Sequence, residues 1–254
     1  MTDLAMGRSG AFDIGKVIER TFGVVGANFP TLFGLALVLA ALPQAVAALA
    51  LSPSAAGAPN LSPLWALGSL VAVVASFVLQ AAVVHASVVD LNGGKASFGD
   101  SLRVGMSNFL PVLGISILMT IGIAFGMILL VVPGVMMAVA WSVAVPAQVV
   151  EKTGVIQSFS RSAELTRGSR WAIFGLFFVY LLLAFGFMLV AGLIFAALSF
   201  MTGGPESLVM RGVITPLLQA VTSMIGASGA AAIYYELRSK KEGVGPQELA
   251  AVFD

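Results

Sequence analysis

The sequence predicts an all-α integral membrane protein. We expect six transmembrane helices, arranged as three parallel hairpin repeats that are each preceded by a cytoplasmic amphipathic helix. Of the 254 residues, 59% are hydrophobic and only 10% are charged, and the mean hydropathy is +1.01. A typical soluble domain has about 25% charged residues, so lipid must solvate much of this chain. Six apolar segments are separated by turn-rich or amphipathic stretches.

The first predicted repeat covers 12–91. Its amphipathic stretch, 12–28, carries apolar side chains at helical spacing and charged ones elsewhere; the apolar positions are Ile14, Ile18, Phe22 and Val25. The first two spans are predicted at 29–51 and 63–91, and Pro43 should kink the first of them. Because charged residues precede the first span, it does not resemble a cleavable signal peptide, and we expect it to be retained.

The second predicted repeat covers 97–150, with an amphipathic stretch at 97–109 and spans at 110–131 and 135–150. Between these spans we predict a tight structural turn at Pro133 and Gly134. The second span has about 16 residues, or roughly 24 Å of helix, which is short for a hydrocarbon layer of about 30 Å. We therefore expect the turn to lie below the external headgroups. Gly134 should either adopt a backbone angle closed to other residues or admit a neighbouring span.

Two glycines, Gly122 and Gly126, have the spacing of a close-packing helix motif. The motif fits either packing inside the bundle or contact with a second copy of the chain, and the oligomeric state stays open.

The third predicted repeat covers 154–236, followed by a short cytoplasmic tail at 237–254. Its spans are expected at 171–201 and 212–235. The repeats are supported by similarity between Asn28–Leu35 and Asn108–Ile115, each of which follows an amphipathic stretch. The whole chain is therefore predicted to be a single integral membrane domain with repeats related by an axis along the membrane normal.

The basic residues predict the orientation. With six spans, all of the 13 Lys and Arg residues except Arg211 fall on the side of the two termini. The positive-inside rule places that side in the cytoplasm. We expect a multi-pass protein of a bacterial cytoplasmic (inner) membrane with both termini cytoplasmic.

The third amphipathic stretch, 153–169, holds the first candidate site, a surface for anionic lipid or for a partner. It comprises Arg161, Glu164, Arg167 and Arg170. A basic group near an anionic leaflet contributes about 1 kcal/mol. The alternative is a solvated face on which Glu164 pairs with Arg161 and Arg167.

The second candidate site is a set of polar groups in the predicted second span, Gln80, His85 and Asp90. Ionisable groups inside a membrane are functional candidates. However, His85 and Asp90 are five residues apart and point to different helix faces. The alternative is that His85 hydrogen-bonds a neighbouring span while Asp90 lies among headgroups.

The composition argues against several function classes. The chain has one His and no Cys, and no acid is expected in the middle of a span, so we expect neither an enzyme nor a cofactor or metal site. A net charge of +1 does not favour nucleic acid as a partner. The first hypothesis is a non-enzymatic membrane module whose cytoplasmic rim binds membrane lipids, anionic ones above all, or a membrane protein partner. The alternative is a transporter of small solutes or lipid, suggested by repeats and Pro-broken spans.

Several short motifs together resemble a known family. They are Phe12–Gly15, Val132–Gly134, Pro146 with Glu151, Arg161-Ser162 with Leu165-Thr166 and Gly168, and the terminal Tyr234-x-Glu236-Leu237-Arg238 with Lys241-Glu242-Gly243. The chain is similar to the bacterial glycerophosphodiester phosphodiesterase membrane-domain family and its stand-alone YciC-like relatives. The resemblance implies a multi-helix membrane module. It transfers no catalytic activity, because the chain has no room for the phosphodiesterase domain.

Overall fold

The computed structural model describes residues 12–50, 63–205 and 207–243, and within them it contains helices and no strands. Six helical segments are long and apolar enough to cross a membrane, which confirms the predicted number of spans: Phe29–Ala48, Ala66–Leu91, Phe98–Leu129, Val131–Glu151, Arg170–Thr202 and Met210–Glu242. The expectations for the N-terminal tail, the loop at 52–62 and the last residues of the chain lie outside the described residues.

The first part of the chain folds largely as expected. It forms α1 (Ile14–Ala27), α2 (Phe29–Ala36), a π-helical turn η1 (Leu37–Ala41), α3 (Leu42–Ala50) and α4 (Pro63–Leu91). Asp13 caps α1 by accepting a hydrogen bond from the Lys16 N–H at 3.1 Å. The π-helical turn lies immediately before Pro43, where a proline removes one backbone donor and widens the helix locally.

The buried face of α1 matches the predicted apolar face in part. Val17, Thr21 and Val24 are buried, and three of the predicted residues pack against the core while partly buried: Ile14, Ile18 and Val25. Phe22, which we placed on the same face, is 54% exposed.

The second predicted repeat needs three corrections. The stretch 97–109 is no separate helix: α5 (Phe98–Leu129) runs on without a break through Pro111. The turn lies at Leu130, whose backbone is extended, and Pro133 and Gly134 lie in the first turn of α6 (Val131–Ala140). Proline is tolerated there because the first N–H groups of a helix have no intrahelical acceptor. The short-span argument therefore fails.

The segment after α6 is broken. Residues 141–143 form a turn, and α7 (Ala144–Glu151) follows it. Next come α8 (Val155–Thr166), α9 (Arg170–Thr202), a second π-helical turn η2 (Met210–Ile214) and α10 (Thr215–Glu242). The first residues of the predicted tail are thus helical, and Gly243, with φ of 64°, ends α10 in the left-handed conformation that glycine favours.

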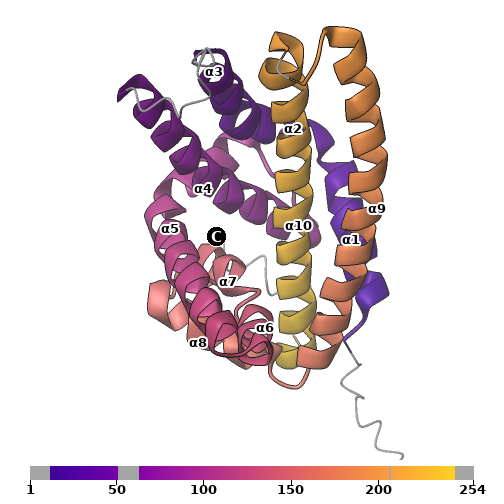
Figure 1. Ribbon diagram of the computed structural model, residues 1–254. Helices are drawn as coiled ribbons and strands as arrows, with labels where there is room; N and C mark the ends of the chain where they lie inside the picture. The colour runs from indigo at the N-terminus through magenta and orange to yellow at the C-terminus, as the bar shows by residue number, and fades with distance from the viewer. Residues whose placement is uncertain (1–11, 51–62, 206, 244–254) are drawn as a thin grey trace, which may run out of the picture.

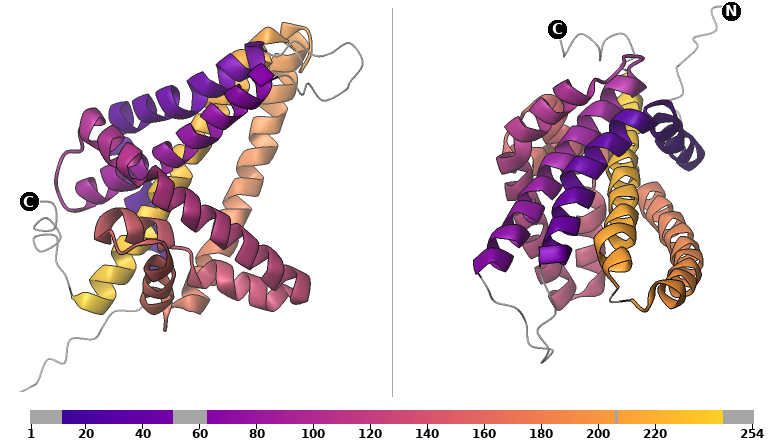
Figure 2. Two further views of the ribbon diagram at one scale, coloured as in Figure 1. Left: turned by 90° about the vertical axis from the view of Figure 1, so that its left-hand side faces the viewer. Right: turned by 90° about the horizontal axis from the view of Figure 1, so that it is seen from above.

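Helices α4, α7 and α10 form the centre of the molecule. Every residue from 144 to 150 on α7 is buried, as are residues 81–88 on α4 and 231–237 on α10. The buried runs on α4 and α7 consist mainly of alanine and valine, whose small side chains let these helices approach closely. Figure 1 shows α10 standing at the centre, and the left view of Figure 2 shows the α5–α6 hairpin diverging from the α3–α4 and α9–α10 hairpins.

The α5–α6 hairpin is held together by its glycines. A Cβ on Gly126 would lie 2.9 Å from the Gly134 Cα, and a Cβ on Gly122 would lie 2.6 Å from the Trp141 ring. A Cβ on Gly134 would lie 2.7 Å from the Met127 backbone nitrogen. Gly134 is not in the positive-φ region, so its role is the close approach of α5 and α6. The motif at Gly122 and Gly126 serves packing within the chain.

Substituting Gly134 should therefore destabilise the hairpin. We expect Gly134→Ala to lower the free energy of unfolding by about 1–3 kcal/mol, because backbone atoms must move to admit the methyl group. Thermal unfolding in detergent measures this. Gly186→Ala on α9, where no atom lies within 4 Å of the added Cβ, is the matched control and should not lower stability. Equal losses in both variants would contradict the close-packing account.

Candidate functional site

The break in the fourth span is closed by α8. Ser162 Oγ donates a hydrogen bond to the Ala140 carbonyl at 2.8 Å and accepts one from the Val143 N–H at 3.2 Å. Both groups lose their intrahelical partners at the break, and unpaired backbone groups are costly in a membrane. The buried face of α8 is accordingly polar, with Ser158, Ser162 and Thr166 all fully buried. This helix is docked on the bundle through hydroxyl groups.

An ion-pair cluster joins the end of α7 to α8 and α10. It consists of Glu151, Arg161, Tyr234, Arg238 and Glu242, and we call it the Glu151 cluster. Arg161 Nε donates to Glu151 at 2.8 Å, and the Tyr234 hydroxyl donates to the same carboxylate at 2.7 Å. Arg161 also binds Glu242. Arg238 completes the cluster through Glu242 at 2.8 Å and the Tyr234 oxygen at 3.1 Å.

Arg161 is the centre of this cluster. Its side chain is 22% exposed and that of Glu151 is 15% exposed. Burial alone would lower the pKa of Arg161, but the hydrogen bonds that it donates to Glu151 and Glu242 outweigh this effect and raise the pKa above its ordinary value. The guanidinium is therefore permanently charged and held by residues that lie far apart in the sequence.

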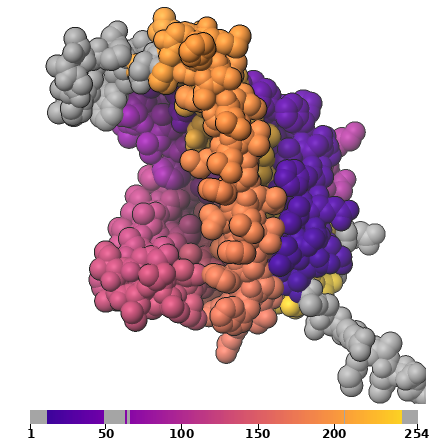
Figure 3. All heavy atoms as spheres, turned by 45° about the vertical axis from the view of Figure 1, so that its right-hand side comes forward, coloured from indigo at the N-terminus to yellow at the C-terminus, as the bar shows by residue number. Residues whose placement is uncertain are grey.

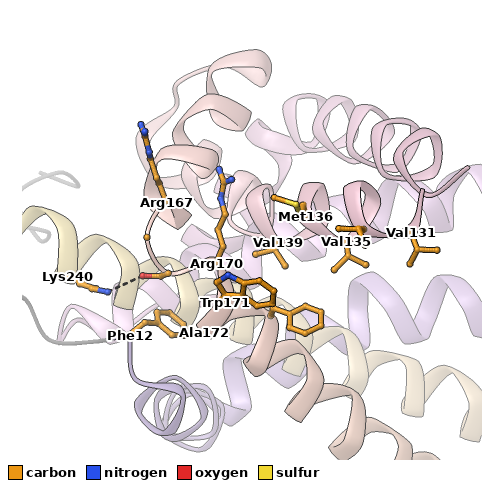
Figure 4. A pocket seen from close by; sticks show the side chains of 14 residues that line it. Phe12, Val131, Val135, Met136, Val139, Arg167, Arg170, Trp171, Ala172 and Lys240 are labelled. Carbon is orange, nitrogen blue, oxygen red and sulfur yellow. Dashed lines mark hydrogen bonds between the residues drawn. The ribbon is translucent and has the colours of Figure 1, made fainter. Parts of the chain in front are cut away.

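A groove lies between α6 and the start of α9, and we call it the α6–α9 groove. Its volume is about 830 Å³, within the range of small-molecule sites. One wall is a row of apolar side chains on α6, and α9 supplies Trp171, Ala172 and Phe174; the α6 row is Val131, Val132, Val135, Met136 and Val139. Figure 4 shows the α6 row with Trp171 beside it, and Figure 3 shows α9 as a ridge next to the α5–α6 hairpin.

One end of the groove is basic. Arg167, Arg170 and Lys240 line it, and none of the acidic residues that the structure describes does. The Lys240 ammonium donates to Ser169 Oγ at 3.1 Å, while Arg170 Nε is buried without a hydrogen-bond partner among the described residues. The uncapped start of α9 lies at the same end and adds the positive pole of a 33-residue helix. The groove thus combines an apolar body with a cationic end.

The structure separates the four residues of the first predicted site. Arg161 and Glu164 lie 3.6 Å apart at the Glu151 cluster, so the expected pairing of these two is present and Arg161 is not free for lipid. Arg167 and Arg170 line the groove instead. Lys240 was missed as a site residue because only the tertiary fold brings α10 beside the start of α9.

The second predicted site is also divided. His85 Nδ1 lies 3.5 Å from Ser101 Oγ of the neighbouring α5, as the structural alternative expected, and Gln80 is half-buried on α4. Asp90 lines a separate cleft of about 510 Å³ with Lys16, Glu19 and Arg20, which we call the α1–α4 cleft. Within the described part of the chain, no three His, Cys, Asp or Glu side chains are grouped closely enough to hold a metal ion.

Removing the Arg161 charge should destabilise the protein. We expect Arg161→Gln to lower the free energy of unfolding by about 1–3 kcal/mol, because Glu151 would remain largely buried without its cation. Thermal unfolding in detergent at neutral pH tests this. Arg167→Gln, which removes an exposed cation outside the cluster, should change stability by less than about 0.5 kcal/mol. Equal melting temperatures for the two variants would contradict a structural role for the cluster.

No family model, characterised protein or solved structure matches the chain. The resemblance to the glycerophosphodiester phosphodiesterase membrane-domain family therefore stays a prediction. Its motif residues Glu151, Arg161, Tyr234, Arg238 and Glu242 nevertheless contact one another, as the Glu151 cluster.

Proposed function

We propose that this chain is a non-enzymatic integral membrane module that binds an anionic phospholipid in the α6–α9 groove. The observation that carries the proposal is the groove itself, whose apolar body ends at Arg167, Arg170 and Lys240. A phospholipid has the matching chemistry: its acyl chains are apolar, and its phosphate accepts hydrogen bonds from guanidinium and ammonium groups.

The charge of the groove favours an anionic headgroup. Arg167, Arg170 and Lys240 line this end, and none of the described carboxylates does; each basic group near an anionic lipid surface contributes about 1 kcal/mol. Trp171 supports this assignment because it is 85% exposed, and tryptophan prefers the boundary between headgroups and hydrocarbon. The lipid would lie with its phosphate beside Ser169 and its chains along α6.

The membrane placement follows from the basic residues. If the six spans cross the membrane in turn, every basic residue of the described chain but Arg211 falls on one side, and the positive-inside rule favours the cytoplasmic leaflet for the cationic end of the groove. That leaflet carries the anionic surface potential that attracts basic segments. The family resemblance supports a multi-helix module of a bacterial cytoplasmic membrane.

The transporter alternative receives less support. Broken helices often create substrate or ion sites in transporters, and span four is broken. However, Ser162 satisfies the freed backbone groups of Ala140 and Val143, which leaves them no role in coordinating a cargo. The α6–α9 groove is lined mainly by apolar side chains, and the chemistry that it fits is retention of a lipid.

Removing the cationic end should weaken lipid binding. We expect Arg167→Gln, Arg170→Gln and Lys240→Gln together to reduce the affinity for phosphatidylglycerol by up to about 3 kcal/mol. Native mass spectrometry of protein released from phosphatidylglycerol nanodiscs measures the retained lipid. Arg103→Gln, which removes an exposed cation outside the groove, is the control. Unchanged retention in the triple variant would refute the groove as the binding site.

The proposed orientation has its own test. The natural chain has no cysteine, so Ser54→Cys and Lys241→Cys are unique labels on opposite predicted sides. In intact cells, an impermeant thiol reagent should label the residue at 54 and not the one at 241, because only the former faces the exterior. Labelling of position 241 alone would show that the orientation is opposite to the proposed one.

A further inference from the structure

The α1–α4 cleft has a charge pattern unlike that of the α6–α9 groove. It is lined by two basic and two acidic side chains, Lys16, Arg20, Glu19 and Asp90. Lys16, Glu19, Arg20 and Gly23 recur at the spacing of one helix face, and Asp90 comes from the last turn of α4. Both signs of charge therefore meet in one cleft between two helices.

The position of Arg20 is fixed by α10. Arg20 forms a salt bridge with Glu236, which is only 8% exposed, and its guanidinium lies 5.0 Å from the centre of the Tyr235 ring. A guanidinium has five N–H donors, so the contact with Glu236 leaves others for a ligand in the cleft. Arg20 is a prearranged anion contact.

Asp90 is placed where its charge is unfavourable. The carboxylate lies in the last turn of α4, beside the negative pole of a 29-residue helix that has no basic residue in that turn. The Gly93 and Gly94 N–H groups already bind the last carbonyls, of Asp90 and Val89. Among the described residues, neither Asp90 nor the exposed Glu19 has an ion-pair partner. Lys16 and Arg20 line the same cleft but form no ion pair with either carboxylate, so both carboxylates can still accept hydrogen bonds from a bound cation.

We propose that the α1–α4 cleft binds the headgroup of phosphatidylethanolamine. Lys16 and Arg20 hold its phosphate, and Glu19 and Asp90 hold its ammonium group. A primary ammonium donates three hydrogen bonds to carboxylates, whereas the quaternary ammonium of phosphatidylcholine has no N–H to donate. The ligand is a lipid because two exposed aromatic side chains place this end of α1 against hydrocarbon: Phe22 on α1 is 54% exposed, and Phe29 at the start of α2 is 47% exposed.

This proposal is independent of the α6–α9 groove, and one experiment separates the two. The full chain is placed in nanodiscs of phosphatidylethanolamine, phosphatidylcholine and phosphatidylglycerol in equal amounts with the same acyl chains. After release in mild detergent, native mass spectrometry counts the retained lipids. We expect the protein to retain phosphatidylethanolamine over phosphatidylcholine by about fivefold, as two solvent-accessible ion pairs allow.

The variants assign that preference to the cleft. Glu19→Gln with Asp90→Asn should reduce the preference to about one and leave retention of phosphatidylglycerol unchanged. Glu164→Gln, which neutralises a carboxylate whose side chain is 69% exposed and lies outside the cleft, should keep the preference. No preference in the natural protein, or a preference that survives the double substitution, would overturn the proposal. The triple substitution in the α6–α9 groove should reduce retention of phosphatidylglycerol and leave the preference for phosphatidylethanolamine unchanged, so its result tests only the groove.

Discussion

The packing of α7, α8 and α10 against one another depends on the largely buried carboxylate of Glu151. It ends α7, whose residues from 144 to 150 are all buried, and it binds Arg161 of α8 and Tyr234 of α10. A buried charge is tolerated only with partners, so each of these helices is fixed relative to the other two. α7 is the second half of the broken fourth span. By binding Arg161, the Glu151 carboxylate therefore also holds the break at residues 141–143 next to α8, whose Ser162 pairs the free backbone groups.

The α6–α9 groove is a consequence of that arrangement. With Arg161 bound to Glu151 and Ser162 bound to the break, the chain leaves α8 beside α6 and carries Arg167 and Arg170 to the edge of the bundle. At the groove, α9 contributes Trp171 and Phe174, which are 85% and 42% exposed, so the start of this helix does not close over the apolar row of α6. The packing of α8 thus decides where the basic residues lie, and the loose packing of α9 leaves space for a lipid beside them.

The sequence predicted the parts of the fold that depend on local pattern. The number of spans and the bounds of α4 were predicted correctly because long apolar runs and their polar ends are visible in the sequence. The turn at Pro133 and Gly134 was misplaced because proline and glycine also suit a first helical turn and a close helix contact. Arg161 was a candidate for lipid or partner binding, and its contact with Glu242 was not foreseen, because Glu242 lies 81 residues away in the sequence. Lys240 was missed for the same reason, since only the packed bundle brings it to Ser169.

A structure determined in phosphatidylglycerol nanodiscs would test the central claim most directly. The account predicts an ordered phospholipid in the α6–α9 groove, with its phosphate among Arg167, Arg170 and Lys240 and an acyl chain along α6 from Val139 to Val131. A groove closed by direct packing of α9 on α6, or an ordered lipid whose phosphate lies away from these three cations, would contradict it.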